Sequence, residues 1–204
     1  MSGICYIVGA GENFGLDFIP TENDFVIAAD GGYEVLTQSG ICPNLVVGDF
    51  DSLGRIPKDE NTVVLPTVKD VTDTWAAIEL GKERGFTRFH LYGCTGGRFD
   101  HTLANIQTVA HVAEQGMECR LYSEHQVITA LSGSTMTFDA DRTGFFSLFA
   151  HTDTCKGVTI RGMKYELEEA ELSNRFPLGV SNEFSGKEST VTVKEGIAIA
   201  VFDR

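Results

Sequence analysis

Over residues 1–123, short apolar runs alternate with stretches whose apolar positions recur at helical spacing. The apolar runs predict strands at "CYIVGAG" (5–11), "DFVIAADGG" (24–32), "NLVVGDFDS" (44–52), "TVVLP" (62–66), "FHLYG" (89–93) and "ECRLYSE" (118–124). The helical stretches are "YEVLTQSG" (33–40), "TDTWAAIELGKERG" (72–85) and "DHTLANIQTVAHVAEQG" (100–116). In the last of these, the face expected to be buried comprises Leu103, Ile106, Ala110 and Ala113. Thr72 or Asp70 can cap the helix over 72–85, and Gly85 can end it.

After residue 124 the pattern changes to strand-like runs broken by Gly, Asp and Ser. These runs are "TMTFDA" (135–140), "GFFSLFA" (144–150), "GVTIRGMKYEL" (157–167), "STVTV" (189–193) and "GIAIAVF" (196–202). The last two predict a hairpin that turns at Lys194–Gly196, although the turn is not of the strongest type. The one stretch that favours a short helix is "ELEEAEL" (166–172). We therefore expect an α/β fold with an N-terminal Rossmann-like parallel sheet domain (residues 1–123), followed by a C-terminal all-β sandwich domain (residues 124–204).

Aspartates follow the predicted strands at their carboxyl ends. They are Asp30, Asp49, Asp51, Asp70, Asp73 and Asp100. Because the carboxyl ends of parallel strands share one edge of the sheet, these side chains are expected to converge there. Like charges so close raise one another's pKa, and a hard cation held by oxygen ligands relieves that repulsion. The pattern thus favours Mg²⁺. A helix cap or Asx turn explains Asp70 and Asp100 equally well, but it explains the Asp49 and Asp51 pair less well.

The segment "YGCTGGRFDH" (92–101) is predicted as strand, glycine-rich loop and helix. Backbone N–H groups of such a loop bind phosphate oxygens, and Arg98 within it can clamp a phosphate in bidentate fashion. Lys69 can add a second cation. A tight turn that needs a positive φ at Gly96 or Gly97 is the alternative for the loop, and His101 is taken as a structural hydrogen-bond partner.

Composition narrows these possibilities. The net charge of −13 argues against a nucleic-acid backbone as partner, because such binding needs a basic surface. The five cysteines form no C-x-x-C pair, so neither a zinc site nor a disulfide framework is indicated. No apolar run approaches the roughly 20 residues of a membrane helix, and the N-terminus lacks a signal-peptide pattern. A cytoplasmic protein without membrane or nucleic-acid partners is expected.

Six motifs in register, "ADGGYEVL", "GDFDSL", "KDVTDTWAAI", "GCTGGRFDHTLANI", "RGMKYEL" and "GVSNEF", closely resemble those of the thiamine pyrophosphokinase family. The resemblance runs from Ile27 to the last predicted strand. It implies transfer of a pyrophosphoryl group from ATP to thiamine, which gives thiamine diphosphate and AMP. It also implies a requirement for Mg²⁺ and a homodimer whose active site lies between subunits.

The resemblance assigns roles to the matching positions. The implied metal set is Asp49, Asp51 and Asp73, with Asp70 close by. Asp49, Asp51, Asp73, Asp100 and Arg98 form the implied catalytic group. The residues implied to face or border the nucleotide phosphates are Asp30, Lys69, Thr72, Gly96, Gly97 and Arg98. Ser181 and Asn182 would contact thiamine across the dimer. Tyr165, Glu183 and Phe184 could face its cationic ring, or they could be ordinary core and surface residues.

Two other functions stay open at this point. One is a Mg²⁺-dependent pyrophosphokinase or nucleotide hydrolase that uses another acceptor. The other is a catalytically silent thiamine-binding protein, which would have little use for so many carboxylates.

We expect the substitution Asp51→Asn to lower turnover by orders of magnitude while the fold stays intact, since it removes one anionic metal ligand. Steady-state kinetics together with a circular dichroism spectrum measure both properties. Near-normal activity in this variant would remove Asp51 from the metal set.

Overall fold

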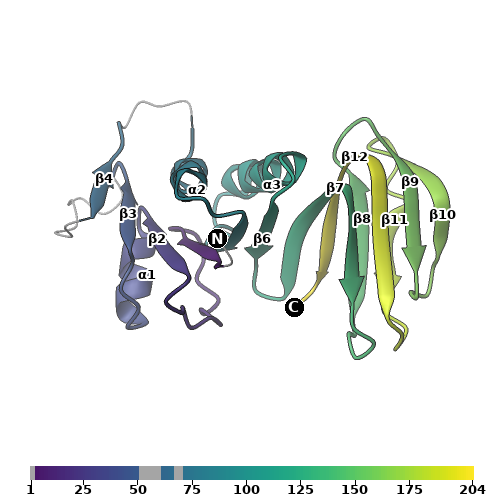
Figure 1. Cartoon of the computed structure of the whole chain (residues 1–204), viewed down its shortest axis with the longest axis horizontal. Coiled ribbons are helices and arrows are strands. Elements are labelled where there is room, and N and C mark those ends of the chain that lie inside the picture. Colours follow the sequence, from purple (N-terminus) through teal and green to yellow (C-terminus); the bar gives the residue numbers. More distant parts are fainter. Residues whose placement is uncertain (1–2, 51–60, 67–70) are drawn as a thin grey trace. The chain divides into compact units, whose positions relative to one another are not determined.

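The computed structural model describes residues 3–50, 61–66 and 71–204. The chain divides into two compact units (Figure 1). Unit 1 comprises Met1–Thr108 and Cys119–Glu124, and unit 2 comprises Val109–Glu118 and His125–Arg204. In the described part of the chain, no helix is long and apolar enough to cross a membrane.

Unit 1 is built on a parallel sheet. Its strands are β1 (Cys5–Val8), β2 (Phe25–Ala29), β3 (Leu45–Gly48), β4 (Thr62–Val64), β5 (Arg88–Tyr92) and β6 (Glu118–Tyr122). The helices are α1 (Gly32–Gln38), α2 (Asp73–Glu83) and α3 (Phe99–Glu114), the last of which continues into unit 2. The strand order is β6-β5-β1-β2-β3-β4, and β1 pairs in parallel with both β2 and β5. Every strand and helix predicted for residues 1–123 is present.

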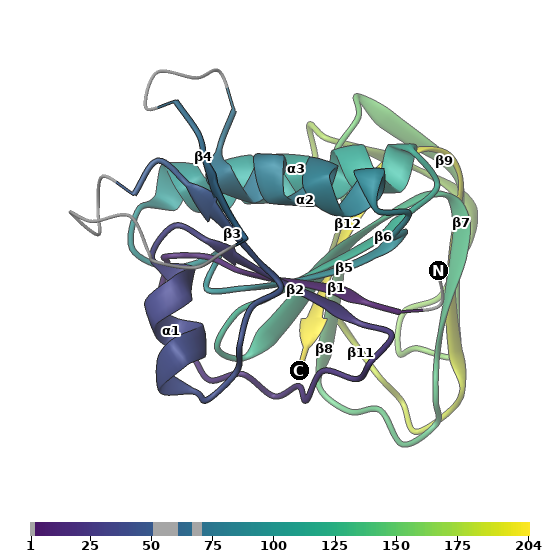
Figure 2. The ribbon, with the colours of Figure 1, turned by 60° about the vertical axis from the view of Figure 1, so that its left-hand side comes forward.

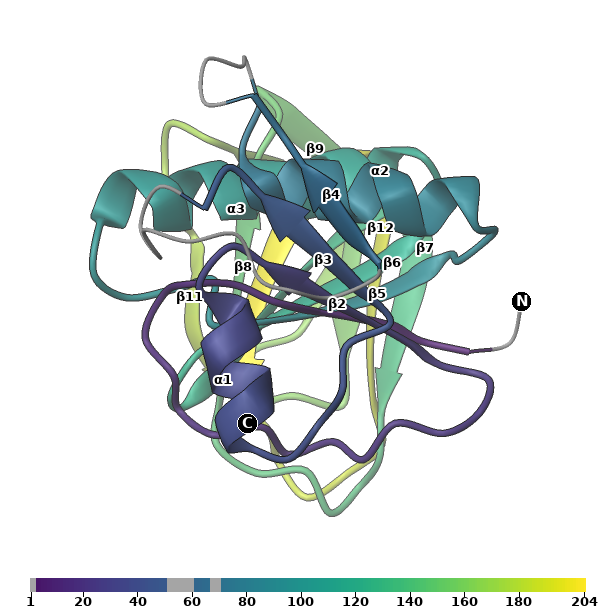
Figure 3. The same ribbon diagram turned by 90° about the vertical axis from the view of Figure 1, so that its left-hand side faces the viewer.

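The central strands β1, β2 and β3 of unit 1 are apolar along their length because both faces of the sheet are covered there. α1 lies on one face, and α2 and the first turns of α3 lie on the other (Figures 2 and 3). Tyr6 and Val8 of β1 belong to one buried cluster with Leu36 of α1. The alternate position Cys5 faces α2, where a Cβ on Gly81 would come within 2.9 Å of its Sγ. Burial on two faces explains the continuous apolar runs in the sequence.

The ends of α2 follow the predicted capping pattern. Thr72 is the N-cap, and its Oγ1 accepts a hydrogen bond of 3.2 Å from the backbone N–H of Trp75. Gly85 ends the helix with a φ of +83°, a conformation that costs glycine little. Of the two capping residues proposed from the sequence, Thr72 is therefore the one the structure uses.

The predicted buried face of α3 is partly wrong. Leu103 is 49% exposed, whereas Asn105 is only 5% exposed. The Asn105 Nδ2 donates a hydrogen bond of 2.8 Å to the carbonyl of Cys94 in the loop after β5. In the first turns of the helix, the buried face thus includes a polar residue with a specific partner rather than the apolar residue that periodicity favours.

The chain reverses direction across the sheet of unit 1 at β1. From β1 it moves outward through β2, β3 and β4, and it then returns to place β5 on the other side of β1. The loops that follow β1 and β5 therefore leave the sheet side by side. In open parallel sheets such a topological switch point forms a crevice at the carboxyl edge.

Unit 2 is rich in strands. They are β7 (Gln126–Phe138), β8 (Phe145–Ala150), β9 (Thr154–Arg161), β10 (Leu167–Ser173), β11 (Gly179–Glu183) and β12 (Ser189–Asp203). The residues of "ELEEAEL" form β10, which pairs antiparallel with β9, so the short-helix alternative is wrong. A parallel α/β sheet followed by a β-rich region is the fold class predicted from the sequence, and the structure confirms it.

The predicted hairpin at Lys194–Gly196 is also wrong, because β12 passes through these residues as one strand. On one edge it pairs with β7 along its whole length, with a register shift between Val193 and Ile197. On the other edge its first half pairs with β9 and its second half pairs with β8. The extra residues form a bulge, which bends the strand at the point where it changes partner. Gly196 allows this with a φ of +83°.

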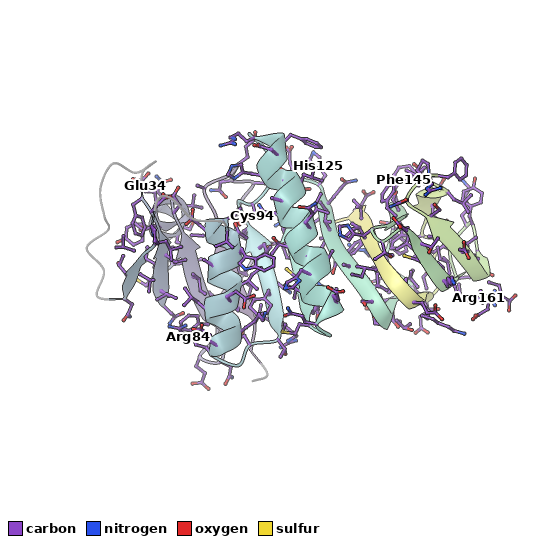
Figure 4. All side chains as sticks on the ribbon, turned by 90° about the horizontal axis from the view of Figure 1, so that it is seen from above. Glu34, Arg84, Cys94, His125, Phe145 and Arg161 are labelled. Carbon is purple, nitrogen blue, oxygen red and sulfur yellow. The ribbon has the colours of Figure 1, made fainter. Side chains whose placement is uncertain are left out.

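Aromatic rings fill the core around β8. Phe146 is fully buried, and it packs against Phe138, Phe184 and Phe202 at centroid distances of 5.8, 6.1 and 6.5 Å. Its neighbour Phe145 (labelled in Figure 4) points to the opposite side of the strand and is 54% exposed. The two adjacent phenylalanines therefore give one buried ring and one largely exposed ring on the same strand.

We expect Phe146→Ala to lower the free energy of unfolding by about 3–5 kcal/mol, because it leaves a cavity among three other rings. The matched control Phe145→Ala should cost about 0.5 kcal/mol or less. Urea denaturation followed by circular dichroism measures both values. Equal losses in the two variants would contradict this account of the core.

Candidate active site

A cavity of about 710 Å³ lies at the carboxyl edge of the sheet in unit 1, at the switch point between β1 and β5. Five segments line it: Gly9–Glu12 after β1, Ala29 and Asp30 after β2, Asp49 after β3, residues 71–74 at the start of α2, and residues 93–98 after β5. His101 and Asn105 of α3 complete the lining. Residues far apart in the sequence thus meet at the edge where the aspartates were expected to converge.

Two loops that follow adjacent strands are joined by hydrogen bonds at the floor of this cavity. The N–H of Gly11 donates to the carbonyl of Gly93 at 2.7 Å, and that of Glu12 donates to the carbonyl of Thr95 at 3.0 Å. The carboxylate of Glu12 accepts from the N–H of Gly97 at 2.9 Å. These contacts extend the pairing of β1 and β5 beyond the strands and hold the glycine-rich segment over the crevice.

Only glycine fits where the two loops approach each other. A Cβ on Gly93 would lie 2.6 Å from the carbonyl oxygen of Gly9, and its φ is +59°. A Cβ on Gly11 would lie 2.6 Å from the carbonyl oxygen of Thr95. Gly96 and Gly97 also have positive φ values, +77° and +57°, so the tight turn considered from the sequence is present in this segment.

The start of α2 packs directly against the loop after β5. The hydroxyl of Thr74 lies 3.8 Å from the Sγ of Cys94, and that thiol donates a hydrogen bond of 3.2 Å to the carbonyl of Tyr92. Burial raises the pKa of Cys94 to about 11, so its thiol is neutral near pH 7. Cys94, labelled in Figure 4 at the end of β5, therefore serves as a small packing residue in the cavity wall.

Three of the predicted carboxylates, those of Asp30, Asp49 and Asp73, line the same cavity. The backbone N–H of Asp30 donates to the carbonyl of Val47 at 2.8 Å, which ties the end of β2 to that of β3. Asp51, Asp70 and Lys69 lie outside the described residues. Within residues 3–50, 61–66 and 71–204, no three His, Cys, Asp or Glu side chains lie close enough together to hold a metal ion. Oxygen-only donors at one edge nevertheless have the chemistry that Mg²⁺ prefers.

Arg98 lines the cavity but is engaged by a carboxylate. Its Nη2 and Nε donate to the two oxygens of Asp100 at 2.6 and 3.2 Å, which is a bidentate pair. The hydrogen bonds from Arg98 hold the pKa of Asp100 below its usual value, and they raise that of Arg98. Asp100 is not among the residues that line the cavity. The structure therefore links Asp100 to the site through Arg98.

The predicted thiamine-side residues lie on β11 of unit 2. Asn182 is buried, and its amide bridges two segments: Oδ1 accepts from the N–H of Tyr165 at 2.9 Å, and Nδ2 donates to the carbonyl of Tyr165 at 2.7 Å. Ser181 is exposed, and its φ of +60° is unusual for a residue other than glycine. Asn182 thus fixes the local backbone, while Ser181 presents its hydroxyl outward.

Charged and aromatic groups surround these two residues. Lys164 donates to Glu183 at 2.6 Å, and the ammonium group lies 5.4 Å from the centroid of the Tyr165 ring. Tyr165 is 58% exposed, whereas Phe184 packs at 5.0 Å from Phe138 in the core. Tyr165 therefore exposes much of its ring, the Glu183 carboxylate is engaged by Lys164, and Phe184 is a core residue.

Sequence reasoning missed the loop after β1. Gly9, Gly11 and Glu12 line the cavity, yet "GAGEN" matches no phosphate-binding motif. It also missed Thr95, whose buried hydroxyl has no hydrogen-bond partner within the described residues. A buried polar atom without a partner is typical of a site whose ligand or water supplies it. The strand order, which places β1 beside β5, was the missing signal.

A parallel sheet with a glycine-walled crevice at its switch point, flanked by carboxylates and an arginine, defines a nucleotide-phosphate-binding α/β protein. Residues 19–121 match the family model "Thiamin pyrophosphokinase, catalytic domain", and residues 135–198 match "Thiamin pyrophosphokinase, vitamin B1 binding domain". The chain belongs to the thiamin pyrophosphokinase family, whose members use ATP and bind thiamine.

Individual relatives agree with this assignment. The chain is 28% identical over 187 residues to thiamine pyrophosphokinase of Bacillus subtilis (strain 168), covering 88% of this chain and 87% of that protein. The crystal structure of thiamine pyrophosphokinase from Bacillus subtilis superposes with a TM-score of 0.85 at 25% identity, covering 98% of each chain. That of thiamin pyrophosphokinase from Geobacillus thermodenitrificans gives 0.85 at 28% identity, covering 98% of this chain and 97% of the other.

We expect Gly93→Ala to destabilise unit 1 more than Gly40→Ala, although both positions have a positive φ, +59° and +71°. Nothing lies within 4 Å of a Cβ on Gly40, so only the backbone strain of about 1–2 kcal/mol applies there. At Gly93 the overlap with the Gly9 carbonyl should add about 1–3 kcal/mol. Urea denaturation followed by the fluorescence of the single tryptophan, Trp75, measures the difference. Equal losses would show that the two loops can separate freely.

Proposed function

We propose that this chain is a thiamine pyrophosphokinase whose phosphate-transfer site is the cavity between the loops after β1 and β5. The observation that carries the proposal is the joint lining of that cavity by glycine backbone, by Arg98 and by the carboxylates of Asp30, Asp49 and Asp73. Phosphoryl-transfer sites need this combination, because positioning and charge neutralisation supply most of their catalysis. Membership of the family gives the reaction, and the geometry supports its location.

The triphosphate of ATP would lie along the glycine-rich segment. Backbone N–H groups at Gly96 and Gly97 offer hydrogen bonds to phosphate oxygens, as in other loops with successive positive φ values. Arg98 adds a planar guanidinium that can exchange its carboxylate partner, Asp100, for a phosphate. Thr72 borders the cavity while its hydroxyl caps α2, and Lys69 is assigned to the same rim from the sequence.

Magnesium is part of the proposal. Asp49 and Asp73, which line the cavity, would hold it, and the sequence assignment adds Asp51 and Asp70, because carboxylate oxygens are ligands that Mg²⁺ prefers. When bound, the ion offsets charge on the phosphate oxygens. Asp30 lines the same cavity and would face the nucleotide phosphates, as the sequence assignment has it.

In the proposed reaction, the primary hydroxyl oxygen of thiamine forms a bond to the β-phosphorus of ATP. The bond between that phosphorus and the oxygen bridging to the α-phosphate breaks, so thiamine diphosphate forms and AMP leaves. Asp73 lines the cavity and can accept the hydroxyl proton. Asp100 is the weaker of the two bases proposed from the sequence, because its two oxygens are bonded to Arg98 and its pKa is lowered.

Thiamine recognition is assigned to unit 2. The exposed Ser181 and the ring of Tyr165, held beside it through Asn182, offer a hydroxyl and an aromatic face to a cationic ring. We propose a homodimer in which these residues serve the partner's phosphate site, and a cytoplasmic location.

We expect AMP release from ATP to require both thiamine and Mg²⁺. Chromatography of the nucleotides with and without each component measures this, and a chelator should reduce the rate to background. A thiamine analogue with hydrogen in place of the primary hydroxyl is the matched control, because it can bind but cannot accept the pyrophosphoryl group.

Two outcomes would favour the rival functions. AMP formed equally fast without thiamine would indicate a nucleotide hydrolase or a pyrophosphokinase with another acceptor. Thiamine binding without any consumption of ATP would indicate a silent binding protein.

A further inference from the structure

The glycine-rich segment after β5 already holds two carboxylates of the chain itself. Glu12 accepts from the N–H of Gly97 at 2.9 Å, and Asp100 accepts from Arg98 at 2.6 Å. Both donors are groups that the proposed function assigns to the phosphates of ATP. A carboxylate oxygen is a close chemical analogue of a phosphate oxygen as a hydrogen-bond acceptor. Carboxylates of the chain thus engage two donors that the proposed function assigns to phosphate oxygens.

Glu12 is held in this place by its backbone as well as by its side chain. Its N–H donates to the carbonyl of Thr95 at 3.0 Å, while its carboxylate accepts from Gly97 two residues further along the same loop. A Cβ on Gly96 would lie 2.5 Å from the Cδ of Glu12, so the side chain lies directly on the loop. The absence of a side chain at Gly96 is what lets Glu12 reach the Gly97 amide.

Negative charge predominates around Glu12, and it would repel the phosphates of a bound nucleotide. Four acidic residues line the cavity, namely Glu12, Asp30, Asp49 and Asp73, whereas Arg98 is the one Lys or Arg among the described lining residues. The Glu12 side chain lies against the loop after β5, whose amides the proposed function assigns to the phosphates, so a triphosphate there would face its negative charge at close range. Two anions cannot share one N–H group with good geometry on both.

We propose that Glu12 is an affinity-determining residue for ATP: its carboxylate accepts a hydrogen bond from the Gly97 amide, and a phosphate oxygen must displace it. The inference rests on the proposed function, and it adds a residue from the loop after β1 to the nucleotide site. Glu12 acts on ATP through the Gly97 amide and through its charge. The same contact joins the loop after β1 to the loop after β5.

The substitution Glu12→Gln separates charge from shape. The amide oxygen of glutamine can still accept from Gly97, so the loop keeps its contact, but the bond becomes neutral and easier to displace. The charge facing the triphosphate is also removed. Glu22→Gln is the matched control, because it removes the same charge from unit 1 at a residue that does not line this cavity.

The experiment is isothermal titration of each protein with an α,β-methylene analogue of ATP in the presence of Mg²⁺. Glu12→Gln should lower the dissociation constant about fivefold, the ratio expected when a charged hydrogen bond becomes a neutral one. Glu22→Gln should leave it within about twofold of the original. In steady-state kinetics, Glu12→Gln should lower the KM for ATP in the same proportion and leave kcat within about twofold, because ground-state binding changes and the chemical step does not.

Three results would overturn the inference. A dissociation constant that is unchanged or raised in Glu12→Gln would show that the carboxylate does not compete with phosphate. Equal tightening in Glu22→Gln would assign the effect to net charge in general. A fall in kcat without a change in KM would make Glu12 part of the chemical step. If the unsubstituted protein fails to bind the analogue, the proposed function itself fails, and that result is distinct from the other three.

Discussion

The close approach of two backbone loops is the constraint on which the site depends. The loops after β1 and β5 lie near enough for Gly11 to bond the carbonyl of Gly93, and no side chain at either residue would fit between them. This approach continues the parallel pairing of the strands beyond the sheet. It gives a rigid floor on which amides of the glycine-rich segment face the cavity. Side chains in place of Gly11 and Gly93 would clash with the backbone of the opposite loop, so the loops could not approach this closely.

Around that floor the chain gathers more negative than positive charge. Asp30, Asp49 and Asp73 share a cavity with Glu12, and Arg98 is already paired with Asp100. Such an arrangement has little affinity for a polyphosphate by itself, since like charges at close range repel. A divalent cation and the release of internal carboxylates from their donors would both change this balance. The excess of acids is therefore consistent with a site in which metal and nucleotide bind together.

In unit 2, one long strand, β12, pairs with β7 on one edge and with two different strands on the other. The bulge between Val193 and Ile197 lets β12 pair first with β9 and then with β8, while β7 accompanies it throughout. The rings of Phe138, Phe146 and Phe202 pack against one another in this unit. The side-chain amide of Asn182 on β11 bonds both the N–H and the carbonyl of Tyr165. These side-chain hydrogen bonds join the two segments in place of backbone pairing between strands.

The sequence by itself determined the elements of unit 1, the carboxyl-edge placement of Asp30, Asp49 and Asp73, and the family. Apolar periodicity, caps and turn residues are local signals, and they were sufficient for those purposes. Tertiary structure decided what local signals cannot encode. Pairing beyond the strand ends brought Glu12 onto Gly97, the contact of Asn105 with Cys94 placed a polar residue on the buried face of α3, and β12 pairs with two partners on one edge as a bulged strand where a hairpin was expected. In each case the deciding contact joins residues distant in sequence, and its energy exists only once the chain has folded.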